Sequence, residues 1–433
     1  MSAPFLGLSA MAVMFALLFL RQPVWLGLAL CGIAGNVLLS NVNVAALVAG
    51  TTTFDTMSSY NLSIVPLFIL MGEVATNSRL SAELFRAARV ILSGLRGGLA
   101  VATIAASGAF GAICGSSVAT AATMTRIALP EMRKAGYEDG FSSATVASGG
   151  TLGILIPPSI ILVIYGAIAE ASVPKLFAAS MVPGLLLLAL YAVVALLVAA
   201  RAPGKVPRDP PASLGERLRS LREPWQFVVL FVVTIGGIYA GIFSPNEAAS
   251  IGAFGAIVLG MLSRRLTIPA LLQAVQVTVI TSCVLFMIII GASIFAHFIV
   301  QTRLPDLLLG LAQGAGLAPW MVMLLIILVY LVMGCFLEGI GMVLITVPVF
   351  LPIVAGYGYD PLWFGVVVVI MVEVGLITPP VGMNLFIIQA QVRDVPISRL
   401  YAGIVPFLAA PLVLVLVLFA WPELVLWLPE LLY

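Results

Sequence analysis

The chain has 433 residues, of which 62% are hydrophobic and only 9% are charged, and its mean hydropathy is +1.19. Soluble proteins carry about 25% charged residues, so these charges are too few to cover a water-soluble globule of this size. The composition therefore predicts a polytopic, all-α membrane protein. The formal net charge of +2 gives no reason to expect a nucleic-acid partner, and we expect none.

A membrane-spanning helix needs about 20 apolar residues. On that basis we expect spans over 4–20, 24–40, 60–76, 97–114, 140–168, 176–200, 225–243, 246–262, 271–300, 319–336, 362–390 and 401–428. Shorter apolar pieces lie at 42–50, 113–130, 303–312 and 337–355. The second and fourth of these precede proline-broken spans. We expect both to belong to re-entrant hairpins, whose backbone faces protein or water instead of lipid.

Two basic stretches indicate which side is cytoplasmic. The segment Arg201–Glu223 holds six Arg and Lys residues, and 79–96 holds four Arg. By the positive-inside rule both are expected in the cytoplasm, where they either set the topology alone or also contact lipid headgroups or a partner subunit. Within the first stretch, Ser213–Arg222 is expected to form a short surface helix.

A paired proline interrupts an apolar run twice, at Pro157-Pro158 and at Pro379-Pro380. Position 379 minus 157 gives an offset of 222, and this offset holds without a gap from Pro130 to Pro174. It pairs prolines with prolines, Tyr137 with Tyr359, and two glycines with glycines. The chain is therefore expected to contain an internal duplication, and matching interrupted segments mark a transporter's binding site.

The duplication sets the expected domain organisation. The first half, 1–200, would hold a hairpin at about 107–134 and a broken helix at about 140–168. A linker follows at 201–223. The second half, 224–433, would hold a hairpin at about 334–355 and a broken helix at about 362–390.

The breaks are candidate cation sites. A proline leaves the carbonyls three and four residues before it without donors, here at Gly153–Leu155 and Gly375–Ile377. Unwound carbonyls coordinate Na⁺ in several transporter folds. The first hairpin adds the hydroxyls of Gly115–Thr123, although small residues of this kind also mediate ordinary helix packing.

Four acidic residues lie in or beside apolar runs: Glu73, Glu247, Glu338 and Glu373. A charge at mid-bilayer costs about 2.5–3.5 kcal/mol on insertion scales, so such residues are functional candidates. For Glu247 we expect a structural role instead, because Ser244, Pro245 and Glu247 form a capping box at a helix start. For Glu73 the alternative to a functional role is a simple position at an interface.

Enzyme activity is not expected. The chain has one histidine, His297, and its four cysteines lie in apolar stretches without metal-ligand spacing. It has no phosphate-binding GxxxxGK[ST] loop. An acid pair of Glu338 and Glu373 is the remaining catalytic alternative, whereas an ion gradient is the expected energy source.

Several motifs resemble those of one transporter family. They are Gly149–Ser159, Gly115–Thr120, Ser244–Ala249, Thr378–Gly382, Met71–Glu73 and Leu129–Met132. Together they resemble the large membrane subunit of tripartite ATP-independent periplasmic (TRAP) transporters over essentially the whole chain. One departure is Asn246, where the family more often has Thr.

The resemblance implies an inverted-repeat, elevator-type transporter with two re-entrant hairpins and two broken helices, similar to the ion transporter superfamily. It implies Na⁺-driven import of an organic acid, such as a dicarboxylate or sialic acid, across the bacterial inner membrane. A periplasmic substrate-binding protein (P type) and a separate small four-helix membrane subunit (Q type) would be its partners. A free-standing transporter of the same fold is the alternative.

The resemblance also implies ligands for two Na⁺ sites. These are Ser116, Ser117, Thr120, Gly153, Ile156 and Pro158 for the first, and Gly334, Gly339, Gly341, Gly375, Thr378 and Val381 for the second. Candidates for substrate contact are Thr151, Asn384, Arg126, Glu338 and Glu373, with a cytoplasmic anchor as the alternative role of Arg126. The second copy is the more polar, because Thr378 and Asn384 align with Ile156 and Leu162.

Overall fold

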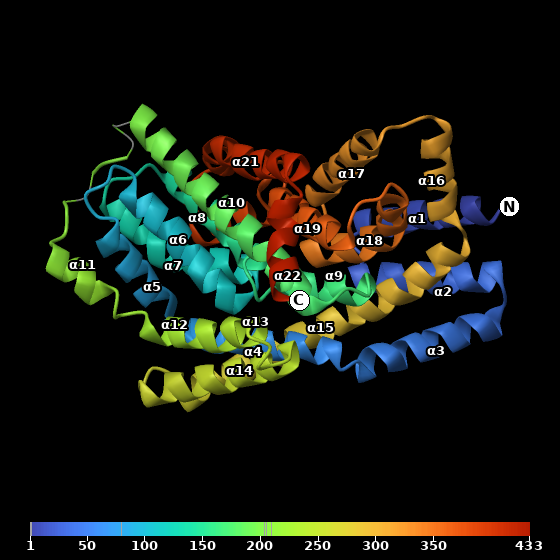
Figure 1. Cartoon of the computed structure of the whole chain (residues 1–433), viewed down its shortest axis with the longest axis horizontal. Helices are drawn as coiled ribbons and strands as arrows, with labels where there is room; N and C mark the ends of the chain where they lie inside the picture. The colour runs from blue at the N-terminus through green and yellow to red at the C-terminus, as the bar shows by residue number, and fades with distance from the viewer. Residues whose placement is uncertain (1, 79, 203, 205, 209) are drawn as a thin grey trace.

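The computed structural model describes residues 2–78, 80–202, 204, 206–208 and 210–433. Within these residues it consists of helices joined by short loops, and the one extended pairing is an isolated bridge between Arg96 and Arg208 (Figure 1). Arg79 of the basic stretch and linker residues 203, 205 and 209 lie outside the described residues. The predicted all-α fold is confirmed.

The first half of the chain contains α1 (Ala3–Phe19), α2 (Val24–Leu39), α3 (Val42–Ser58), α4 (Ile64–Asn77), α5 (Leu80–Ile91), α6 (Gly98–Cys114), α7 (Ser117–Lys134), α8 (Asp139–Leu155), α9 (Ile160–Ile168) and α10 (Val173–Arg201). The remainder contains α11 (Leu214–Ser220), α12 (Trp225–Phe231), a π-helical turn (Val232–Gly236), α13 (Gly237–Tyr239), α14 (Pro245–Leu262), α15 (Ile268–Gln301), α16 (Leu304–Gly314), α17 (Pro319–Gly334), α18 (Gly339–Gly356), α19 (Pro361–Ile377), α20 (Met383–Gln391), α21 (Ile397–Ala420) and α22 (Glu423–Leu432).

The described helices have the length and composition of a polytopic membrane protein. Five are long and apolar enough to cross a membrane, and the number rises to eight if each bent pair counts as one span. Five shorter apolar helices accompany them. Many large apolar side chains on their outer faces are exposed, including Phe54, Leu196 and Leu416, as expected of surfaces that meet lipid.

The first proline pair breaks a helix that follows a helical hairpin. Helices α6 and α7 form the hairpin around a tight turn, where Gly115 adopts φ +63° and Ser116 caps α7 by accepting a hydrogen bond from Ala119 N–H. Helix α8 then ends at Leu155, and α9 continues after a bend of 43°. Ser159 restarts the helix by accepting a hydrogen bond from Leu162 N–H.

The second proline pair has the same surroundings. Helices α17 and α18 form the hairpin, and α19 and α20 form the broken helix. Helices α7 and α18 are both 18 residues long, and α8 and α19 are both 17 residues long. Each pair begins at positions related by the same offset as the prolines, so the sequence repeat coincides with a repeat of helices.

The helix boundaries differ from the expected ones at the hairpins. The first arms begin at Gly98 and Pro319, well before the expected starts at 107 and 334, because each arm is the complete apolar helix before the turn. The apolar pieces at 42–50 and 303–312 extend into the full helices α3 and α16. The expected capping box of Ser244 and Glu247 is confirmed at the start of α14, and a second one opens the short linker helix α11.

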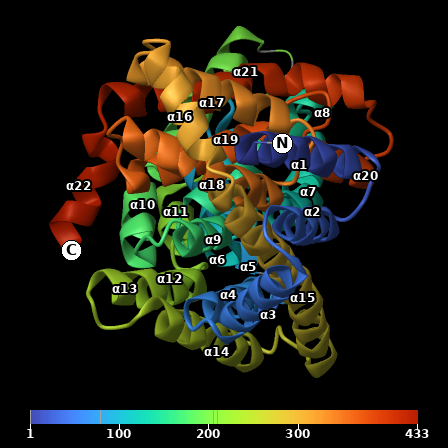
Figure 2. The same cartoon turned by 90° about the vertical axis from the view of Figure 1, so that its right-hand side faces the viewer.

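The two repeats pack against each other. Figure 1 shows the hairpin α6–α7 on the left and α17–α18 right of centre, and α20 of the second repeat contacts α7 and α8 of the first. The long helix α15 runs beside α2, α3 and α4 and contacts all three. Turning the molecule by 90° shows α15, α3, α4 and α14 together beneath the repeats (Figure 2). We call α2, α3, α4, α14 and α15 the scaffold.

Close backbone approach holds α2 against α15. A Cβ added to Gly32 would lie 2.7 Å from the Phe295 backbone nitrogen, which leaves no room for it. Gly32→Ala should therefore destabilise the protein by about 1–3 kcal/mol through overpacking. We expect a lower Tm in detergent-solubilised protein. Gly50→Ala is the matched control, since nothing lies within 4 Å of a Cβ at Gly50, and it should leave Tm unchanged or raise it. Equal effects of the two substitutions would contradict the close contact.

Candidate functional site

A cavity of about 480 Å³ lies where the two hairpin turns meet the scaffold. The first turn contributes 114–119 and the second contributes 338–340. Ile160 and Leu376 come from the two helix breaks, and the opposite wall is formed by α4 and α15. The repeat thus places both of its special turns around one space large enough for a small organic molecule.

Three helices begin at this cavity. The first residues of α7, α18 and α9 line it. A helix N-terminus carries free N–H groups and a partial positive charge, and it is a ready site for an anion. The two hairpin turns differ in charge, however, because Ser116 caps α7, whereas the carboxylate of Glu338 caps α18 by accepting a hydrogen bond from Ile340 N–H.

The lining side chains carry negative charge. Glu73 and Glu338 both line the cavity and are half-buried, and the described lining residues include no Lys, Arg or His. Arg126, which lies outside the lining, partly compensates Glu73 electrostatically, but burying a second carboxylate without compensating charge is unfavourable. An anion in this cavity would therefore need bound cations as well as the helix N-termini.

The first helix break and the first hairpin bring oxygen atoms together. A Cβ on Gly153 would overlap the Gly111 Cα region and would lie 2.9 Å from Thr120 Oγ1 and 3.3 Å from the Ser116 carbonyl oxygen. Thr120 Oγ1 is buried and has no hydrogen-bond partner in the described structure. A buried hydroxyl without a partner beside a broken helix fits a Na⁺ ligand set.

The second break shows a related arrangement. A Cβ on Gly375 would lie 3.1 Å from the Gly334 carbonyl oxygen, so the hairpin and the break are again in backbone contact. The Thr378 hydroxyl donates to the Val374 carbonyl at 2.6 Å, which leaves its lone pairs free to accept or to ligate. The backbone of Gly382 passes close to the Thr378 carbonyl oxygen.

Other residues expected at the cation sites have different surroundings. A Cβ on Gly339 would meet Val372, and one on Gly341 would meet Val24 of α2. The side chain of Ile156 is buried against Gly108 and Gly184. The Pro158 carbonyl lies beside Gly115, and the Val381 side chain is half-buried. The glycines of α18 therefore serve close packing in this structure, and the breaks supply the converging oxygens.

Thr151 and Glu373 occupy equivalent positions of the two repeats and lie next to each other behind the cavity. Both are fully buried. The Thr151 hydroxyl donates to the Ser148 carbonyl and lies 3.1 Å from the Tyr191 hydroxyl. Of the five residues expected to contact substrate, Glu338 lines the cavity and these two do not.

Asn384 connects the two repeats. It is fully buried on α20, and its side-chain amide donates to Ser117 Oγ on α7 at 2.7 Å, while its own carbonyl oxygen has no partner in the described structure. Ser117 lines the cavity and Asn384 lies one layer behind it. In this conformation Asn384 can act on a ligand only through Ser117.

Arg126 lies in a separate pocket of about 510 Å³ near the base of the first hairpin. Arg133 and Asp394 share this pocket, and they form an ion pair at 2.8 Å that joins the two repeats. Arg126 is exposed there, which fits an anchor more closely than a substrate ligand.

Sequence reasoning missed the scaffold wall of the cavity. Ile69 and Thr281 line it, together with one face of α15. Helix α15 is apolar over its whole length, so periodicity could not indicate which face meets the cavity. Glu73 at the interface was the one signal, and the structure places it in the cavity.

A polytopic helical protein with paired hairpins and broken helices around one cavity has the architecture of a secondary transporter. The chain belongs to the family described as the tripartite ATP-independent periplasmic transporter, DctM component, whose family model matches residues 11–424.

Two relatives and one solved structure illustrate the similarity. The C4-dicarboxylate TRAP transporter large permease protein DctM of Pseudomonas aeruginosa is 38% identical, over 87% of this chain and 88% of that protein. The sialic acid TRAP transporter large permease protein SiaM of Vibrio cholerae is 32% identical, over 94% and 97%. The crystal structure of the Alcanivorax borkumensis YdaH transporter superposes with a TM-score of 0.63 at 17% identity, over 94% of this chain and 98% of that one. The last comparison shows the fold alone.

The Asn384–Ser117 hydrogen bond can be measured by a double-mutant cycle. Asn384→Leu and Ser117→Ala should show a coupling energy of about 1 kcal/mol in unfolding free energy, because either change removes the same buried bond. Chemical unfolding in detergent is the measurement. Strictly additive effects would contradict the contact between the repeats.

Proposed function

We propose that this chain is the large permease subunit of a Na⁺-coupled transporter that imports a small organic acid across the bacterial inner membrane. The observation that carries the proposal is the cavity at which both hairpin turns and three helix N-termini converge. Family membership supports the permease role. The names of two relatives include a C4-dicarboxylate and sialic acid, which are carboxylates of different size. They support organic acids as the substrate class without selecting one acid.

The charge of the cavity supports cation coupling. An organic acid placed between Glu73 and Glu338 needs positive charge nearby. The two break regions offer backbone carbonyls together with the hydroxyls of Thr120 and Thr378, all of them hard oxygen ligands. One Na⁺ site in each repeat would place positive charge at the cavity wall, where it would compensate the negative charge of the substrate.

Energetics also favour two ions. Concentrating a substrate a thousandfold costs about 4.1 kcal/mol. One charge crossing 100 mV yields about 2.3 kcal/mol. A single Na⁺ with a monoanion moves no net charge and keeps only the energy of its own gradient. Two Na⁺ with a monoanion carry one net charge and gain the electrical contribution as well, whereas two Na⁺ with a dianion gain none.

An elevator movement is the mechanism that we propose. The cavity lies between the scaffold helix α15 and the paired turns of the repeats, so sliding of the repeats along the scaffold would carry a bound ligand. The same proposal assigns two partners, a small membrane subunit and a periplasmic substrate-binding protein. The word "large" in the names of the relatives supports the first.

Uptake into proteoliposomes tests the proposal. The chain would be reconstituted with a small subunit and a binding protein of the same transporter family, and uptake of radiolabelled organic acids would be measured with and without an inward Na⁺ gradient. Thr120→Val should raise the half-saturating Na⁺ concentration about tenfold, the effect of losing one ligand worth about 1.4 kcal/mol. Uptake without Na⁺, or by this chain alone, would contradict the proposal.

Thr125→Val is the matched control. Thr125 lies on the same helix, but its hydroxyl donates to the Ala121 carbonyl instead of facing the break. It should leave the half-saturating Na⁺ concentration unchanged. A similar rise in the half-saturating Na⁺ concentration in both variants would contradict the assignment of Thr120 as a Na⁺ ligand.

Cross-linking across the cavity tests the movement. Ile161 on α9 and Leu285 on α15 both line the cavity, so a bifunctional maleimide joining Ile161→Cys to Leu285→Cys, in a background without native cysteines, should abolish uptake. The control joins Asn36→Cys to His297→Cys within the scaffold, where the native side chains are 3.3 Å apart. Continued uptake after complete cross-linking of the first pair would contradict an elevator movement.

A further inference from the structure

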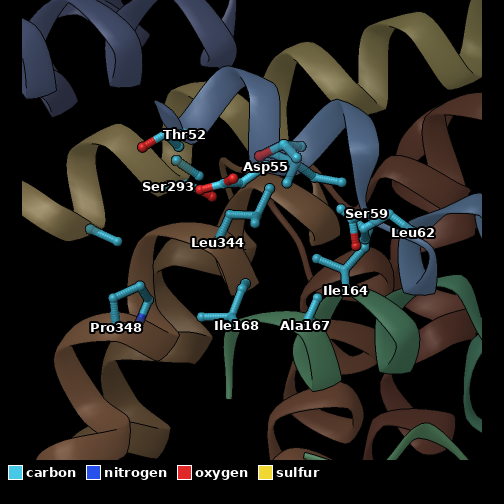
Figure 3. A pocket seen from close by; sticks show the side chains of 14 residues that line it. Thr52, Asp55, Ser59, Leu62, Ile164, Ala167, Ile168, Ser293, Leu344 and Pro348 are labelled. Atoms are coloured by element: carbon cyan, nitrogen blue, oxygen red, sulfur yellow. The ribbon is translucent and has the colours of Figure 1, made fainter. Parts of the chain in front are cut away.

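A second cavity, of about 350 Å³, lies farther along the same interface. It is lined by α3, α9, α15 and α18. Thr52, Asp55 and Ser293 lie along one wall, and Leu344, Ile168 and Pro348 lie opposite (Figure 3). The polar lining residues all come from the scaffold side, whereas the residues from the repeats are all apolar. We call this space the outer vestibule.

The outer vestibule continues from the central cavity along shared helices. On α15, residues 280–288 line the central cavity and residues 289–296 line the vestibule. The first turn of α9 lines the central cavity, and its last turns line the vestibule. Helix α18 likewise lines the central cavity with its first residues and the vestibule with later ones. The two spaces are thus successive sections of one interface.

The direction of this path follows from the charges. Helix α15 begins just after Arg264 and Arg265, and the positive-inside rule assigns that end to the cytoplasm. The vestibule lies toward the other end of α15. It is therefore on the extracytoplasmic side of the central cavity, where material to be imported enters.

Asp55 is the single charged residue among the described residues that line the vestibule. Its carboxylate forms no ion pair or hydrogen bond with any described residue, and α3 with α4 forms a bent pair apolar enough to span a membrane. An acidic residue in such a segment is a functional candidate. An anionic substrate would be repelled by it, whereas a cation would be attracted.

The hydroxyls around Asp55 are uncommitted as well. Within the described structure, neither Thr52 nor Ser293 uses its side chain in a hydrogen bond. Their neighbours on α3 behave differently, because Thr51 and Thr53 donate to the Leu47 and Ala49 carbonyls. The side-chain oxygens that make no hydrogen bond in this region therefore lie on one wall of the vestibule.

We propose that Asp55, Thr52 and Ser293 form an outer cation site that captures Na⁺ before it moves to the helix breaks. One carboxylate with neutral hydroxyls matches a monovalent ion in charge. The bound ion also cancels the charge that would repel an organic acid, so the site favours entry of the cation first. This inference rests on the proposed Na⁺ coupling, since it assigns the entry route of the coupling ion.

The test is protection of a cysteine inside the vestibule. In a background without native cysteines, Ala296→Cys would be labelled with a small maleimide in NaCl or in choline chloride. Ala296 lines the vestibule without belonging to the site. We expect Na⁺ to slow the labelling, Asp55→Asn to abolish this effect, and Asp55→Glu to preserve it. Asp306→Asn, an exposed acid on α16, is the matched control and should preserve it too.

Uptake gives the second measurement. Asp55→Asn should raise the half-saturating external Na⁺ concentration roughly five- to tenfold, the effect of losing one charged ligand. Protection by Na⁺ that persists in Asp55→Asn, or protection by the organic acid instead of Na⁺, would overturn the outer cation site. Protection does not require transport, so a Na⁺-independent uptake would refute the coupling proposal without removing this site.

Discussion

The structure depends on one constraint, the need to satisfy backbone carbonyls where a membrane helix is broken. A broken helix is tolerated at membrane depth only where protein or a watery cavity covers the freed groups. Here each break is covered by the turn of its own hairpin. Gly111 meets Gly153 in the first repeat, and Gly334 meets Gly375 in the second. Any side chain at these four positions would separate the hairpin from the break, so the glycines make the functional geometry possible.

The same constraint sets the electrostatics of the interface. Breaking a helix creates a new N-terminus, and α9 contributes one to the central cavity beside those of α7 and α18. These positive ends face Glu73 and Glu338, and Asp55 lies farther out. The side chains along this path therefore carry negative charge, whereas the helix N-termini that face it carry partial positive charge. Such a path accepts an anion most readily once cations occupy the carboxylates.

The sequence predicted the features that its residue patterns record and missed the contacts between distant segments. The offset of the prolines led to the repeats because matched residues can be compared directly over Pro130–Pro174, and Ser244-Pro245-Asn246-Glu247 led to the cap of α14 because that motif lies within a few residues. Asn384 was expected to face the substrate. In the structure it lies behind Ser117 as seen from the cavity, and Ser117 belongs to the other repeat. Asp55 passed unnoticed between the apolar piece at 42–50 and the span expected at 60–76. No periodicity indicates which residues of two distant repeats will meet.

The duplicated turns are not equivalent in charge, and this difference would orient an anionic ligand. Both turns place an N-cap at equivalent positions, Ser116 in the first repeat and Glu338 in the second. A carboxylate at an N-cap already compensates the positive end of its helix, so α18 has little attraction left for an anion. Helix α7 begins with a neutral serine and keeps its attraction. The acid group of a substrate should therefore lie at the first hairpin, beside Ser117, and it is Asn384 that fixes the position of that serine. Asn384, a polar residue specific to the second repeat, would thus act on a ligand through the first repeat.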